Sequence, residues 1–363
     1  MRRRLAFGIA LGGSVVIACQ LLAGIDDRTL GDSGITEDGG VDPCSIVNLP
    51  GAPISPPPDT NPITVTAALS QIMLGATDGG PYYGFNLDKT CTCPDVESCV
   101  PQGDAGAHCD DDGGIDNYAR RAFEQINAVS SAFGDAGGLI TEKKLNLALT
   151  SGLSGALIEI SKYNGQSDDG QVTVTIYASQ GFDGYPDAAP AFDGKDHWIV
   201  DPGSASGQYS TTNAYVVGFT LVATGLNFPI VIGSATTQPV TIQLDEGIIE
   251  AKLVMSGNQL VSLTGVLGGR WDPAKFLPSL QSVPDPYFGG YLCGNDPVYG
   301  VVKNIICGNT DINVSSAGDH SGPCNSVSMG LGFQALPAMM GNVGSYVDAG
   351  QPCGATWKDS CNN

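Results

Sequence analysis

The sequence feature that most constrains the fold is an alternation of apolar and polar residues in the middle of the chain. From Gln171 to Ala178, apolar residues occupy every second position, and threonine or tyrosine fills the positions between them. A period of two places alternate side chains on opposite faces of a β-strand, so this stretch predicts a half-buried strand. Residues 156–162 alternate similarly, and the segment from Asn164 to Gly170 supplies a turn between the two strands.

A second alternating pattern predicts a long hairpin. Ala251, Leu253 and Met255 fall on one face, Gly257-Asn258 interrupts the run, and Val261, Leu263 and Leu267 resume the buried face. Further strands are expected over residues 215–222, 228–232 and 240–244, and helices over residues 115–133, 141–150 and 297–306. Asp116 or Asn117 is placed to cap the first helix. The fold expected is mainly β, a two-sheet antiparallel sandwich with a few short helices and a disulfide-rich loop.

The N-terminus has the layout of a bacterial signal peptide, which we assign to residues 1–18. Arginines at positions 2–4 precede an uncharged run from Leu5 to Ala18 that is too short to span a bilayer. Val16-Ile17-Ala18-Cys19 resembles a lipobox, which predicts lipidation of Cys19; the alternative is an ordinary secretory peptide with a chance cysteine. Gln20 after the cysteine favours the outer membrane, while the face of that membrane stays open. We therefore expect an exported lipoprotein of the cell envelope that is attached to the membrane by its lipid anchor.

The rest of the chain divides into two parts. Residues 19–60 are rich in Asp, Gly and Pro, which predicts a flexible, lipid-anchored tether. Residues 61–363 contain no second linker of this kind and are expected to form a single disulfide-braced, β-rich domain.

Ten cysteines remain after Cys19, an even number in an oxidising compartment, and five disulfides are the default expectation. They are Cys44, Cys91, Cys93, Cys99, Cys109, Cys293, Cys307, Cys324, Cys353 and Cys361. Spacing leaves the connectivity open; if the front cluster of four pairs internally, Cys44 must reach the back cluster of five. A zinc site in the front cluster is the alternative, although paired Cys-x-x-Cys knuckles are lacking.

Composition excludes some partners and favours one kind of ion. Removing residues 1–18 takes away three arginines and no acid, so the formal charge goes from −21 to −24, which argues against binding of nucleic acid. The acids comprise 30 Asp and 7 Glu, and Asp favours turns and caps. Short carboxylates in loops are the usual ligands of calcium.

A candidate calcium site lies in the disulfide-rich loop. We select Asp88, Asp110, Asp112 and Asp116 as its ligands, with Asn86 as a further oxygen. An EF-hand is excluded because no Glu closes the loop at position twelve. In the alternative interpretation, these acids cap the loop and the following helix.

A second acidic loop runs from Phe182 to Trp198 and mixes aromatic rings with Asp193 and Asp196. Such residues serve sugar-binding and sugar-cleaving sites, but they also pack long ordered loops, and packing is the preferred interpretation. No catalytic residue is assigned, because the chain lacks Gly-x-Ser-x-Gly, His-Glu-x-x-His and phosphate-loop motifs.

Two sets of motifs carry a resemblance. Gly84-Phe-Asn-Leu-Asp88, a Cys-rich loop and Gly114-Ile-Asp-Asn117 before a helix resemble a group of uncharacterised secreted proteins and predicted lipoproteins of myxobacteria. The segment Gly24-Ile-Asp-Asp-Arg28 after the lipobox is similar to the start of many such lipoproteins. The resemblance implies location and source, and it implies no activity.

Three functions are open at this point. The first is a non-enzymatic, extracytoplasmic ligand-binding module, with a glycan or other envelope ligand and with calcium as a cofactor. The second is a secreted polysaccharide hydrolase that uses loop carboxylates, and the third is a purely structural envelope protein.

Overall fold

The computed structural model describes residues 48–57, 61–75, 81–93, 97–101, 108–132, 140–232, 240–285, 287–346, 352–354 and 357–361. The signal peptide, Cys19, Cys44 and most of the tether predicted for residues 19–60 lie outside the described residues. Within the described part, no helix is both long and apolar enough to cross a membrane.

Strands dominate the described residues, which confirms the mainly β fold with a few short helices. The strands are β1 (Ile63–Met73), β2 (Gly155–Tyr163), β3 (Thr173–Phe182), β4 (His197–Val200), β5 (Ser210–Thr211), β6 (Ala214–Val217), β7 (Thr220–Ile232), β8 (Val240–Ser256), β9 (Gln259–Trp271), β10 (Val327–Pro337) and β11 (Met339–Val343). The helices are α1 (Tyr118–Ala132), α2 (Glu142–Ser151), α3 (Pro273–Phe276) and α4 (Pro297–Gly308), with short 3₁₀ segments η2 (Leu277–Ser282) and η3 (Ser316–Gly318).

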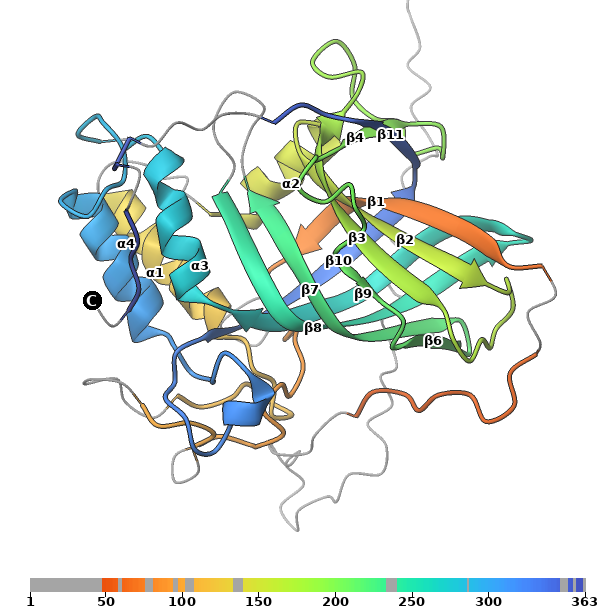
Figure 1. Ribbon diagram of the computed structural model, residues 1–363, viewed down its shortest axis with the longest axis horizontal. Helices are drawn as coiled ribbons and strands as arrows, with labels where there is room; N and C mark the ends of the chain where they lie inside the picture. Colours follow the sequence, from red (N-terminus) through yellow and green to blue (C-terminus); the bar gives the residue numbers. More distant parts are fainter. Residues whose placement is uncertain are drawn as a thin grey trace, which may run out of the picture.

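The strands form one 11-stranded sheet in the order β11-β4-β3-β2-β1-β10-β9-β8-β7-β6, with β5 paired to β3. β11 and β4 run parallel, and the other pairs run antiparallel. The sheet curls back on itself, because the Val172 amide donates to the Ala214 carbonyl (2.9 Å) and Asp169 pairs with Val216 of β6. The two layers expected of a sandwich are therefore two halves of one continuous sheet, with the main core between them (Figure 1).

β3 shows how the predicted alternation is used. Val172, Val174 and Ile176 are buried in the main core, as their spacing predicts. The opposite face is buried as well, because Tyr177 packs with Trp198 and with residues of β1, β2 and β4 in a second apolar cluster.

β8 and β9 form the predicted long hairpin, and they turn at Gly257, whose φ of 59° favours glycine. Leu253 and Leu263 lie opposite each other and are buried. Val261, expected on the buried face, is 45% exposed. The register shifts beside Met255, so Val261 has no partner across the ladder and turns outward as an extra residue.

Helices α1, α3 and α4 gather at one end of the sheet (Figure 1). α1 begins at Tyr118 rather than at Ile115, because Ile115 and Asp116 form short β bridges with earlier segments. Asn117, one of the two residues expected to cap this helix, has a side-chain amide that bridges to the backbone of Gly330 in β10. α2 and α4 lie where short helices were predicted.

Four disulfides join described residues and brace the loops against the sheet. They are Cys93–Cys109, Cys99–Cys324, Cys293–Cys353 and Cys307–Cys361. Cys91 is disulfide-bonded too. Because Cys99 reaches the back cluster, internal pairing of the front four is excluded. The zinc alternative is excluded as well, since disulfide cysteines offer no thiolate to a metal.

Candidate functional site

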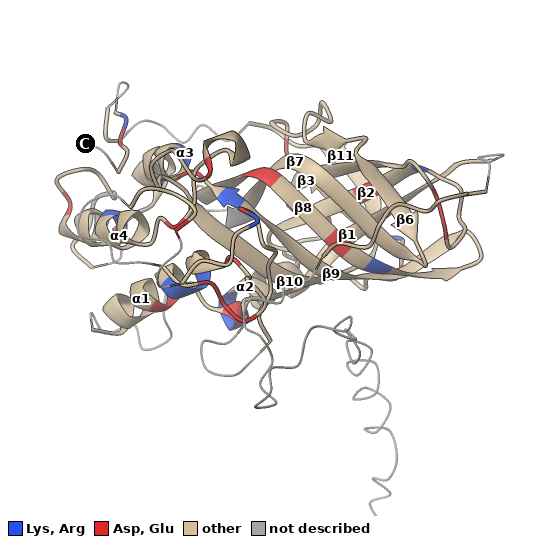
Figure 2. Cartoon of the chain, turned by 90° about the horizontal axis from the view of Figure 1, so that it is seen from below, with Lys and Arg blue, Asp and Glu red and all other residues tan. Residues whose placement is uncertain are grey.

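An open pocket of about 400 Å³ lies where α1 meets the segment that follows β1. Four of its residues come from α1 at helical spacing, and the other two come from the loops before it. The lining residues are Tyr82, Asp111, Arg120, Arg121, Glu124 and Gln125. Figure 2 shows acidic and basic residues side by side along α1. Sequence reasoning missed this pocket, although the order Arg-Arg-x-x-Glu-Gln on one helix gives a signal for a polar surface.

Two cation–aromatic contacts fix the arginines of the pocket. The Arg120 guanidinium lies 5.3 Å from the Tyr82 ring centroid, and the Arg121 guanidinium lies 4.6 Å from that of Tyr118. Arg120 also donates to both carboxylate oxygens of Asp111 at 2.7 Å, and both side chains of this ion pair are largely buried. The pocket wall is therefore rigid and presents charged groups beside an aromatic ring.

Beginning at Asp110, the neighbour of Asp111 in the pocket lining, the structure gathers four carboxylates from three segments. Asp110 and Asp116 occupy facing positions of a small hairpin, because Asp111 and Ile115 pair between them. Asp88 approaches from the preceding loop, where its amide donates to Asp116 Oδ2 (3.3 Å). The fourth carboxylate, Asp311, comes from the segment before β10, and the charges of Asp88 and Asp110 act on it.

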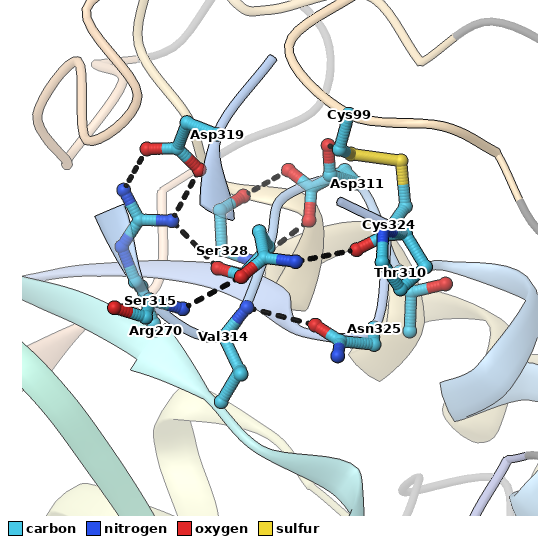
Figure 3. The surroundings of a disulfide bond; sticks show 12 residues. Cys99, Arg270, Thr310, Asp311, Val314, Ser315, Asp319, Cys324, Asn325 and Ser328 are labelled. Atoms are coloured by element: carbon cyan, nitrogen blue, oxygen red, sulfur yellow. Dashed lines mark hydrogen bonds and ion pairs between the residues drawn. A yellow bond between two sulfur atoms is a disulfide. The ribbon is translucent and has the colours of Figure 1, made fainter. Parts of the chain in front are cut away.

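Asp311 differs from Asp88 and Asp116 because both of its oxygens accept hydrogen bonds. Oδ1 accepts the Ser328 amide (2.7 Å), and Oδ2 accepts the Ser328 hydroxyl. Figure 3 shows this carboxylate beside the Cys99–Cys324 disulfide. Asp311 was not predicted as part of the site, because it lies far along the chain in a segment without a motif.

Burial dominates the electrostatics of the carboxylate cluster, which we define as Asp88, Asp110, Asp116 and Asp311. Burial raises the pKa of Asp116 well above its ordinary value, and the charges of Asp88 and Asp110 raise it further. Burial also raises the pKa of Asp110 to about 6 and that of Asp311 to about 7. The pKa of Asp88 is raised, again chiefly by burial. The fold therefore holds acids where they resist ionisation without a compensating group.

Several oxygens around the cluster are buried without a hydrogen-bond donor. They are Asn86 Oδ1, Asp88 Oδ2, Asp116 Oδ1, Thr92 Oγ1 and Ser98 Oγ, although the Ser98 hydroxyl lies beside Asp88 and the Asp110 carboxyl lies beside Asp116. Asp88 is 3% exposed and Asp116 is 1% exposed, so solvent does not satisfy these atoms.

Of the four ligands predicted from the sequence, the structure brings Asp88, Asp110 and Asp116 together. Asp112 lies apart, exposed in the turn that Gly113 and Gly114 form with positive φ. No three or more His, Cys, Asp and Glu side chains of the described ranges form a ready-made metal-binding group.

The second acidic loop packs against itself. The rings of Phe182 and Phe192 lie 6.3 and 5.9 Å from that of Trp198. Asp196 is buried and accepts the Phe192 amide, and Asp193 is paired with a neighbouring lysine. These bonds match the packing interpretation of the loop.

No protein-family model matches the chain, and no characterised protein or solved structure gives a match either.

Proposed function

We propose that this chain is a lipid-anchored protein of the bacterial cell envelope that binds an extracytoplasmic glycan without chemical turnover. The lipobox at Cys19 and the Gln20 after it support export and attachment to the outer membrane. The disulfides support an oxidising location. The motif resemblance supports a relationship to myxobacterial predicted lipoproteins.

The observation that carries the binding proposal is the composition of the α1 pocket. One aromatic ring, Tyr82, stands among guanidinium, carboxylate and carboxamide groups. A sugar offers apolar C–H groups to a ring and hydroxyls that both donate and accept hydrogen bonds, so it complements such a wall. One salt bridge, from Arg120, and a ring contact for each arginine hold the two side chains in place before any ligand arrives, which lowers the entropic cost of binding.

Binding without turnover is favoured because the carboxylates are committed elsewhere. Asp111 is held by Arg120, and Asp88 and Asp116 are too buried for a polymer to reach. Glycoside cleavage needs two carboxyl groups that flank the scissile bond. In the second acidic loop, Asp196 is buried and serves the backbone of its own turn.

The site is tested with Tyr82→Ala in a soluble Cys19→Ala background, on any polysaccharide that retains the parent protein. We expect affinity to fall by about tenfold, equivalent to about 1.4 kcal/mol. Tyr346→Ala is the matched control, because Tyr346 is 79% exposed and does not line the pocket. Equal retention of the Tyr82 variant and the control variant would place the ligand elsewhere.

A further inference from the structure

Among the described residues, no salt bridge pairs a cation with the carboxylate cluster, although the charge of Arg270 acts on Asp88. The nearby buried cation, Arg270, uses its side chain on Asp319, Glu246, Asn313 and the Leu87 carbonyl. Like charges that face each other in a hairpin, as Asp110 and Asp116 do, repel. Four acids in this interior therefore need protons or a cation.

The arrangement of the oxygens favours a cation. Asp116 Oδ2 accepts the Leu87 amide (2.6 Å) and Asp88 Oδ1 accepts the Thr90 amide (2.8 Å), so each carboxylate is fixed by one oxygen. The second oxygen of each, Asp116 Oδ1 and Asp88 Oδ2, is buried; the Asp110 carboxyl lies beside Asp116, and the Ser98 hydroxyl lies beside Asp88. Asn86 repeats this pattern: its Nδ2 donates to the Thr90 carbonyl (2.9 Å), and its Oδ1 is left without a donor.

Asp110 completes the set. Its Oδ2 accepts the Thr92 amide (2.8 Å), which orients the carboxylate beside Asp116. Buried oxygens with no donor each cost about 1–3 kcal/mol, and more when charged, unless a ligand satisfies them. A protonated carboxyl satisfies one acceptor, whereas one cation satisfies several at once.

We propose that Asn86, Asp88, Asp110 and Asp116 bind one Ca²⁺. All four would bind through hard side-chain oxygens carried by loop residues. Calcium prefers such ligands, whereas zinc prefers nitrogen and sulfur ligands. Calcium takes six to eight oxygens, and hydroxyl, backbone carbonyl and water oxygens fill the remaining positions. Thr92 Oγ1 is buried nearby without a partner, and the Ser98 hydroxyl lies within hydrogen-bonding reach of Asp88.

The ion would join two loops that carry few backbone bonds to each other. The Cys93–Cys109 disulfide already closes the segment between them, 16 residues apart, which holds the ligands near one another. Since Asp110 adjoins Asp111 of the pocket wall, calcium would also stiffen the pocket. The ion site itself does not depend on the proposed glycan function.

The test is calcium titration of the soluble Cys19→Ala protein by calorimetry, with CaCl₂ as the only ligand. We expect one site per chain and a higher melting temperature in calcium than in chelator. Asp116→Asn should weaken calcium binding by at least about tenfold, because it removes a charged ligand while keeping the shape.

Asp112→Asn is the matched control, since it removes the same charge from an exposed position in the same loop. It should bind calcium as the parent does. Folding is checked in chelator, where Asp116→Asn should melt no lower than the parent because asparagine is neutral and does not repel Asp88 and Asp110. Absence of calcium binding by the parent, unchanged affinity in Asp116→Asn, or equal loss in Asp112→Asn would overturn the proposal.

Discussion

Replacement of Arg270 should destabilise the fold strongly, because this buried side chain makes several polar contacts. It is 1% exposed, and its guanidinium donates to Asp319 (2.6 and 2.9 Å), Asn313 (2.6 Å) and Leu87 (2.8 Å), with Glu246 at 3.2 Å from Nε. The four N–H groups on its two terminal nitrogens therefore all make hydrogen bonds, and Nε forms an ion pair with Glu246. Figure 3 shows its paired bonds to Asp319. This side chain therefore joins β9 to two loops, one of which carries the proposed calcium ligands.

Arg270→Met should lower the free energy of unfolding by about 3–5 kcal/mol, because Asp319 is left buried and unpaired. Urea unfolding, followed by the fluorescence of the neighbouring Trp271, measures this loss. Lys275→Met is the control: Lys275 is half exposed, and its ion pair with Asp245 is worth about 1 kcal/mol or less.

The double variant Arg270→Met, Asp319→Asn should recover part of the loss, because the uncompensated charge is gone. A cost for Arg270→Met no larger than that of Lys275→Met would refute this reasoning, as would a double variant that is simply additive.

Three further predictions concern the loops and the sheet. Replacing Cys99 and Cys324 by serine should lower the urea midpoint and cost up to about 5 kcal/mol, since the bond closes a 225-residue loop; an unchanged midpoint would contradict this. Burial raises the pKa of Asp311 from 3.8 to about 7, so the folded protein holds a proton that the unfolded chain releases. In chelator, stability should therefore fall by at most about 4 kcal/mol as the pH rises from about 4 to about 7, and melting of Asp311→Asn should show a flatter dependence. Gly330→Ala should loosen the segment over β10, because a Cβ there would lie 2.2 Å from the Tyr83 carbonyl oxygen; faster hydrogen exchange over residues 81–90 would reveal it, and unchanged exchange would argue against it.

The sequence was most informative where structure is local. The alternating pattern correctly predicted strand β3, and the interruption at Gly257-Asn258 correctly predicted the turn between β8 and β9. These predictions succeed because a period of two depends only on neighbouring residues. The bulge at Val261 was not predictable, since it depends on the register with the opposite strand. The curl that brings Val172 to Ala214 also depends on pairing between distant residues.

In the candidate site, too, only the residues that lie close together in the sequence could be predicted. Asp88, Asp110 and Asp116 could be selected from their spacing in one loop region. Asp311 could not, because its place in the cluster follows from the path of β10 and from the disulfide that links Cys99 to the segment before it. The α1 pocket could not be predicted from the sequence, because polar residues on a helix face usually indicate only exposure to solvent.

The most direct test of the central claim is retention of the soluble Cys19→Ala protein on a panel of insoluble cell-wall and plant polysaccharides, with released sugar assayed in the supernatant. Retention is measured both with calcium and with chelator, which shows whether binding to the polysaccharide depends on the ion. The account predicts retention on at least one polysaccharide without release of sugar. Release of sugar would contradict it in favour of a hydrolase, and failure to bind any polysaccharide would contradict the glycan proposal and favour a structural envelope protein.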